Sequence, residues 1–119
     1  MKKIVKIGNK EYTMQASAYT QFLYRNNTGR KYMQDLKQIA NTKMENDDIL
    51  ETLDQLDDFT EIIFKIAFTM IQEADSKQVT SFADFLKSID SVFDDTTWVN
   101  DTIELAMTPL SGGNKTAPQ

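Results

Sequence analysis

Residues 59–74 read FTEIIFKIAFTMIQEA, the most apolar stretch of this 119-residue chain. Drawn as a helix, the stretch is apolar over well over half of its circumference, and its polar side chains form one stripe at spacings of four, four and three: Glu61, Lys65, Thr69 and Gln72. A helix so broadly apolar belongs at the centre of a fold. At 1.5 Å per residue it spans roughly 24 Å, the width of a small domain. We therefore expect the other elements to pack around it.

Two shorter helices are expected after this stretch. Ser81-Phe82-Ala83-Asp84 resembles a capping box with Asp in place of Glu, and the helix that it begins has a shared face of Phe82, Phe85, Leu86 and Ile89. A last helix around residues 97–107 carries Trp98, Val99, Ile103, Ala106 and Met107, and it ends near Pro109. Residues 111–119 hold no apolar anchor, so we expect a flexible tail there.

A β-hairpin is expected at the start of the chain, over residues 2–15. Residues 2–7 are β-branched and partly alternating, Gly8-Asn9-Lys10 supplies turn residues, and residues 11–15 alternate again, with Tyr12 and Met14 on one face. A lone hairpin is marginal in water. It must therefore lie on the helices or pair with another chain.

Three more helices are expected between the hairpin and the central stretch. Ser17 is a candidate cap for the first, which carries Tyr19, Phe22 and Leu23 on one side and stops at Gly29. The second has an apolar stripe of Tyr32, Met33, Leu36, Ile39 and Ala40, followed by a polar loop over residues 41–46. Asp47 is a candidate cap for the third, which carries Ile49, Leu50, Leu53 and Leu56. The expected fold is mostly α (α+β): one domain over residues 1–110, with an N-terminal hairpin and about five or six helices packed round the central one.

Composition excludes several kinds of chemistry. The chain has no cysteine and no histidine, which excludes disulfides, thiol nucleophiles, Ser-His-Asp and Cys-His triads, and structural zinc. No apolar run approaches the roughly 18 residues of a membrane span, and the start is too charged for a signal peptide. No glycine-rich loop that cradles phosphate is present. We therefore expect a cytoplasmic protein that is not an enzyme and has no cofactor, no metal and no membrane partner.

Charge is divided unequally along the chain. Residues 1–43 hold nine basic and two acidic side chains, a formal charge of +7, whereas residues 44–119 hold four basic and sixteen acidic ones, −12, for a total of −5. One interpretation is that the two parts pack together and neutralise each other. The other is that they attract copies of the chain head to tail or a partner of either sign. The basic part contains four tyrosines, but the chain as a whole is acidic, so we do not expect nucleic-acid binding.

Two clusters have both a structural and a functional interpretation. Asp54, Asp57, Asp58 and Glu61 could form a hard-cation or acid–base site, but the calcium-loop pattern with its central glycine is missing. A solvated face with acids near a helix N-terminus explains them as well. The aromatic side chains Phe82, Phe85, Phe93 and Trp98 are either core residues or a grip for a partner helix.

Four stretches carry a resemblance to a known family. In chain order they are IVKIGNKEYTM (4–14), SAYTQFLYRNNTGRKYMQDL (17–36), FTEIIFKIAFTMIQEADSKQ (59–78), and VTSFADFLKSID (79–90) with TTWVNDTIELAM (96–107). Their order resembles the tail assembly chaperones of long-tailed phages and prophages of Gram-positive bacteria. None of the four is an active-site signature, and the match is one of aromatic, turn and helix positions.

The resemblance implies a self-associating helical protein in the bacterial cytoplasm that coats the tape measure protein during tail assembly. It would keep that long helical partner soluble and leave before the virion is complete. A longer frameshifted form would bring in the major tail protein, which forms the subunits of the tail tube. A long helix with exposed apolar stripes aggregates unless it is covered. Gly112-Gly113-Asn114 is compatible with the slippery heptamer G GGA AAC, or with a plain flexible tail.

The expected contact residues come from both parts of the chain. For partner binding we select Phe82, Phe85 and Trp98, and for self-association the basic residues Arg25, Arg30 and Lys31. Two alternatives remain open. One is a structural virion component, such as a head–tail joining or tail-end protein. The other is a small acidic regulatory protein that binds a basic partner.

Overall fold

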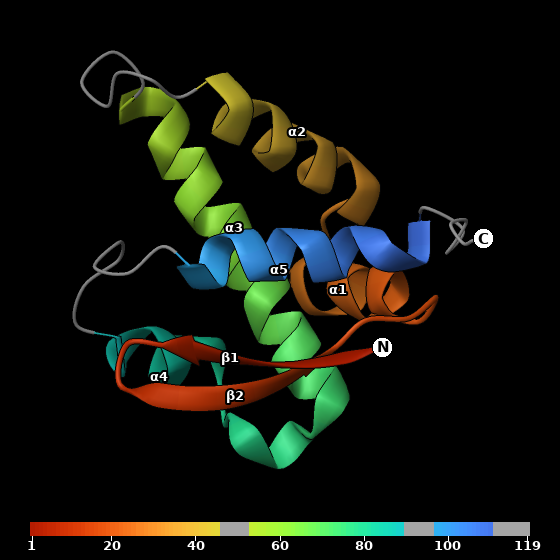
Figure 1. The fold of residues 1–119 in the computed structure, drawn as a ribbon, viewed down its shortest axis with the longest axis vertical. Coiled ribbons are helices and arrows are strands. Elements are labelled where there is room, and N and C mark those ends of the chain that lie inside the picture. Colours follow the sequence, from red (N-terminus) through yellow and green to blue (C-terminus); the bar gives the residue numbers. More distant parts are fainter. Residues whose placement is uncertain (46–52, 90–96, 111–119) are drawn as a thin grey trace.

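Figure 1 presents a computed structural model of the chain, which describes residues 1–45, 53–89 and 97–110, with side chains for 1–41, 57–89 and 97–110. The long helix α3 (Leu53–Ala74) runs through its middle. As expected from its composition, the stretch 59–74 is the core of the fold, and its buried side chains include Ile62, Ile63, Ile66 and Ile71. The predicted central helix is confirmed.

The central helix is longer than predicted. It begins at Leu53, so Leu53 and Leu56 belong to it and not to a separate helix; Asp47, Ile49 and Leu50 lie outside the described residues. Thr69, which the sequence places in the polar stripe, is buried and its hydroxyl donates to the Lys65 carbonyl at 2.8 Å. A threonine can satisfy its hydroxyl within its own helix, which allows it to face the core.

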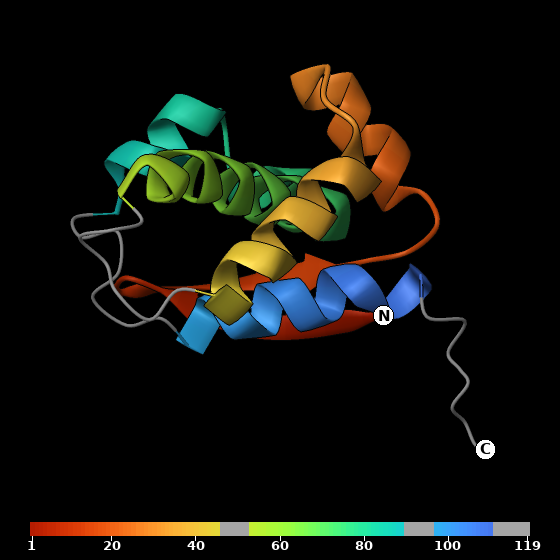
Figure 2. The same ribbon diagram turned by 90° about the horizontal axis from the view of Figure 1, so that it is seen from above.

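The predicted hairpin is confirmed and lies on the helices. Strand β1 (Lys2–Ile7) pairs antiparallel with β2 (Lys10–Gln15), and the turn places Gly8 at φ 66°. The inward face buries Val5, Ile7, Tyr12 and Met14. β2 packs on α3 and β1 packs on α5 (Thr97–Met107), so the hairpin and α5 share one side of α3 (Figure 2).

Helix α1 (Thr20–Thr28) differs from the prediction at its start and in its buried face. Its N-cap is Tyr19, and no side chain caps it; the Ser17 hydroxyl instead donates to Glu73 at 2.7 Å. The buried side chains are Thr20 and Tyr24, so Tyr19 and Phe22 are exposed, contrary to the predicted face. The predicted stop is confirmed, because Gly29 adopts φ 74° and its N–H bonds to the Arg25 carbonyl.

Helix α2 (Tyr32–Glu45) also departs from the prediction at two points. Tyr32, Leu36 and Ile39 are buried as expected, but Met33 is 51% exposed. The helix continues over residues 41–45, where we predicted the start of a polar loop. Adding a residue to an existing helix costs little free energy, because the helix is already nucleated, and Lys43, Met44 and Glu45 are good helix formers.

The C-terminal helices follow the sequence more closely. The Ser81 hydroxyl accepts the Asp84 N–H at 3.1 Å and caps the short helix α4 (Phe82–Lys87), as predicted. α5 buries Trp98, Val99, Ile103 and Ala106, and the short 3-10 helix η3 (Thr108–Leu110), which contains Pro109, follows it. A second 3-10 helix, η2 (Ser76–Gln78), follows α3. The expected class, a hairpin followed by helices around an apolar centre, is confirmed. None of the described helices is long and apolar enough to cross a membrane.

Candidate protein-interaction surfaces

An aromatic cluster joins α3, α4, α5 and β2. The ring of Phe64 lies 5.1 Å from that of Trp98 and 6.2 Å from that of Phe85, measured between centroids. Phe85 also meets Tyr12 edge to face at 5.6 Å. Edge-to-face and tilted pairs at such distances are favourable beyond the area that they bury. The cluster therefore holds the hairpin and three helices together.

Two of the three predicted partner contacts lie in this cluster. Phe85 is 2% exposed and Trp98 is 3% exposed, so neither ring is available on the surface. We correct that assignment: both are core residues, because the hairpin and α3 supply aromatic and aliphatic neighbours that cover them. Phe82 is half-buried and stays accessible, although its ring meets that of Phe68 at 5.5 Å.

Next to this cluster, with which it shares Phe64, a groove of about 600 Å³ lies between α3 and α4. We call it the α3–α4 groove; its lining residues are Asp57, Thr60, Glu61, Phe64, Phe82, Leu86 and Ile89. The capped start of α4 sets the direction of that helix, which keeps Leu86, 36% exposed, beside the half-buried Phe82 and Ile89. Apolar side chains thus line its α4 side, and two carboxylates belong to its α3 side.

The two carboxylates of the groove have different surroundings. Glu61 accepts a hydrogen bond from Lys65 Nζ at 2.7 Å, and Arg30 Nη1 lies 3.8 Å away. The Lys65 hydrogen bond and charge, with Arg30 adding to them, lower the pKa of the Glu61 carboxyl below its usual value. Asp57 is exposed and forms no ion pair with the described residues. Asp57 is therefore the carboxylate of the groove that can receive an incoming cation.

The acidic cluster predicted near this point is only partly described. The side chain of Asp54 lies outside the described residues, whereas Asp57 and Asp58 are exposed. Among the parts of the chain that the structure describes, no three acidic, histidine or cysteine side chains converge as metal ligands would. Of the predicted acidic cluster, Asp57 and Asp58 are therefore exposed to solvent and Glu61 is paired with Lys65 and lies near Arg30.

Arg30, one of the three predicted self-association residues, is engaged inside the fold. Its Nε donates to Asp35 Oδ2 at 2.7 Å and its Nη2 to Asp35 Oδ1 at 3.1 Å. The Tyr24 hydroxyl donates to the same Oδ2 at 2.6 Å. Burial is the main cause that raises the pKa of the Tyr24 hydroxyl, and its hydrogen bond to Asp35 adds to this effect. The hydrogen bonds to Asp35 raise the pKa of the Arg30 guanidinium. Arg30 is thus paired within its own chain while its side chain stays 39% exposed, and its role in self-association stays a prediction.

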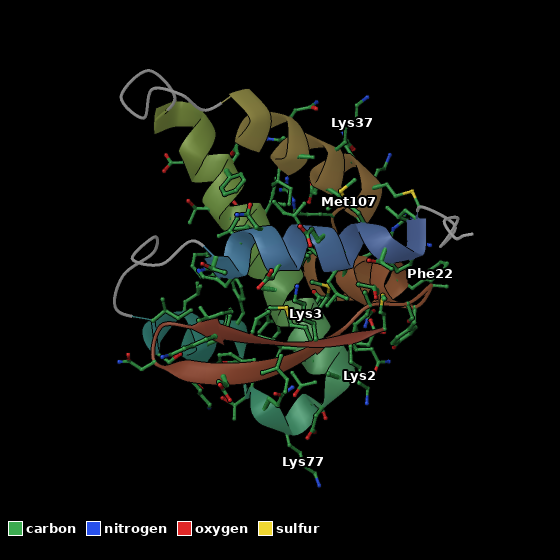
Figure 3. All side chains as sticks on the ribbon, viewed as in Figure 1. Lys2, Lys3, Phe22, Lys37, Lys77 and Met107 are labelled. Atoms are coloured by element: carbon green, nitrogen blue, oxygen red, sulfur yellow. The ribbon has the colours of Figure 1, made fainter. Side chains whose placement is uncertain are left out.

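Arg25 and Lys31, the other two basic residues, are exposed and belong to a second surface. They line a shallow cavity of about 180 Å³ together with Gln21, Phe22, Tyr32 and Met33. Phe22 is 64% exposed, and Figure 3 shows it at the side of the molecule away from α4. We call Phe22, Arg25, Lys31 and Met33 the α1–α2 patch. It combines an exposed ring with two cations that form no ion pair with any described residue.

Sequence reasoning missed the apolar members of the α1–α2 patch. Phe22 and Met33 fit apolar faces by spacing, so the sequence predicted that they face the helix partners. Thr20 and Tyr24 face the core instead, where carboxylates on other helices, Glu73 on α3 and Asp35 on α2, accept their hydroxyls. No local signal marks such partners. Gly112, Gly113 and Asn114 lie outside the described residues.

Comparison with protein-family models, with curated proteins and with solved structures finds no match to this chain.

Proposed function

We propose that this chain is a tail assembly chaperone that binds the tape measure protein of a long-tailed phage or prophage, and that the α3–α4 groove receives its helix. The proposal combines the order of the four sequence stretches with one structural observation, the groove itself. We refer to the tape measure protein below as the client. The self-association implied by the resemblance is part of the same proposal.

The groove supports this function by its shape and its lining. An amphipathic helix binds a groove by inserting apolar side chains at helical spacing. Phe82, Leu86 and Ile89 offer apolar surface for such side chains, and the buried Phe64 ring lies at the α3 wall of the groove. Asp57, at the groove's edge, favours a basic residue next to the inserted ones. The surface therefore suits a helix with an apolar stripe bordered by Lys or Arg.

We expect Leu86→Glu to abolish most of the chaperone effect. A carboxylate at this position must lose its hydration when an apolar side chain enters the groove, so client binding should weaken by about tenfold or more. The measurement is co-expression with a candidate tape measure protein, scored by the soluble fraction of that protein and by co-purification.

Ile4→Glu is the matched control for that variant. Ile4 is an exposed side chain on β1 that does not line the groove, so the same charge is added elsewhere on the surface. The wild-type chain and Ile4→Glu should both raise the client's solubility. If the wild-type chain neither co-purifies with the client nor changes its solubility, the proposed function is wrong.

Mass spectrometry of purified particles tests the structural alternative. A chaperone leaves before the tail is finished, so peptides of this chain should be missing from mature virions while the client is detected. A virion component would instead appear in a constant ratio to the client. Detection at such a ratio would replace the chaperone by a head–tail joining or tail-end protein.

A further inference from the structure

The α1–α2 patch and the α3–α4 groove are complementary in both polarity and charge. The patch presents the exposed Phe22 ring with two cations, Arg25 and Lys31, that form no ion pair with the described residues. The groove presents an apolar lining with the exposed carboxylate of Asp57, which forms no ion pair with the described residues. An aromatic anchor that enters an apolar pocket, with charge pairs at the rim, is a common arrangement in protein interfaces.

The two surfaces are built on different elements and approach each other where Glu61 of the groove lies 3.8 Å from Arg30, the residue before Lys31. In both Figure 1 and Figure 2, α4 and the first half of α3 lie on one side and α1 on the other. One chain therefore cannot bring its own patch to its own groove. Two patches facing each other would place the Arg25 and Lys31 side chains of both copies together, which is unfavourable. The groove of another copy offers the patch the complementary polarity and charge.

We propose that the α3–α4 groove receives the α1–α2 patch of a second copy, so that self-association and client binding exclude each other. Contact between different faces is heterologous and extends into open arrays unless the rotation closes a ring. In such an array the apolar groove of each inner copy is covered until a client helix displaces the neighbouring patch. The competition depends on the proposed function, whereas the self-association itself does not.

Charge reversal on each surface tests the contact. We expect Arg25→Glu/Lys31→Glu and, separately, Asp57→Lys to weaken self-association by about tenfold or more, because each places like charges across the interface. The measurement is sedimentation velocity of the full chain over a range of concentrations. Lys2→Glu/Lys77→Glu changes the net charge as much as the first variant but on exposed positions outside both surfaces, and it should associate like the wild type.

Mixing the two interface variants tests directly whether the patch of one copy contacts the groove of another. An equimolar mixture of Arg25→Glu/Lys31→Glu and Asp57→Lys brings opposite charges together at every contact, so association should return. Recovery in the mixture supports the proposed contact. Unchanged association of the separate variants, or no recovery in the mixture, would overturn it.

Client binding separates this inference from the proposed function. Arg25→Glu/Lys31→Glu leaves the groove intact and should co-purify with the client at least as well as the wild type, while Leu86→Glu should lose both client and self-association. Added client should shorten wild-type arrays; arrays that keep their length with client bound would overturn the competition. A client that binds none of these variants would contradict the proposed function and leave the result on self-association standing.

Discussion

Replacing Phe64 with alanine is expected to lower the free energy of unfolding by about 3–5 kcal/mol. Phe64 is buried on α3 and its ring contacts those of Trp98 and Phe85, so the substitution removes a large apolar side chain and two aromatic contacts at once. The cavity that remains is bordered by Phe85 of α4 and Trp98 of α5. Phe68→Ala should cost a similar amount, since that ring meets Phe82 and Phe85.

Phe22→Ala is the matched control for this prediction. It removes the same ring from an exposed position on α1, where the change should stay within about 0.5 kcal/mol. Urea denaturation followed by circular dichroism measures all three variants. A cost below about 1 kcal/mol for both Phe64→Ala and Phe68→Ala would show that the aromatic cluster does not form the core.

Periodicity predicts this part of the fold because its signal is local and strong. In residues 59–74 nearly every turn carries several large apolar side chains, so no alternative face competes for burial. Gly29 and Ser81 are likewise predictable, because a positive φ and an N-cap hydrogen bond each involve only a few neighbouring residues. The same holds for the turn at Gly8.

The amphipathic helices α1 and α2 are harder to orient from sequence. Both have two candidate faces, and the choice depends on polar groups that belong to other helices. Tyr24 faces inward because Asp35 accepts its hydroxyl, and this leaves Phe22 outside. Because spacing alone treats the apolar Phe22 and Met33 as core residues, it misassigned the patch that we propose as a docking surface.

The groove could be predicted only in part. Phe82, Phe85, Leu86 and Ile89 were expected to share one helical face. Phe82, Leu86 and Ile89 line the groove together, but Phe85 is buried and α4 ends at Lys87, so Ile89 lies beyond the helix. Their partial exposure arises because Phe85, on the same short helix, takes the place beside Phe64 and Tyr12. That competition between rings of one helix depends on the position of the hairpin, which is more than 60 residues away in the chain.

Asp35→Ala is expected to lower the free energy of unfolding by about 2–4 kcal/mol. Asp35 is buried and accepts three hydrogen bonds, from the Tyr24 hydroxyl and from two nitrogens of Arg30. Without the Asp35 carboxylate, the hydroxyl of the fully buried Tyr24 has lost this acceptor, and the Arg30 guanidinium has lost its bidentate partner. The Arg30 side chain is 39% exposed, so water can replace part of what it loses, which keeps the cost below that of breaking a fully buried pair.

Asp57→Ala is the control that separates this network from a general effect of charge. Both substitutions remove one aspartate, but Asp57 is exposed and unpaired among the described residues, so its loss should change stability by less than about 0.5 kcal/mol. Tyr24→Phe should cost about 1 kcal/mol, because Arg30 still satisfies the carboxylate. In the double variant Tyr24→Phe/Asp35→Ala no hydroxyl is stranded, so its cost should be less than the sum of the single costs. Strict additivity would mean that the two side chains do not interact, and α1 would then need another reason to turn Tyr24 inward and leave Phe22 on the surface.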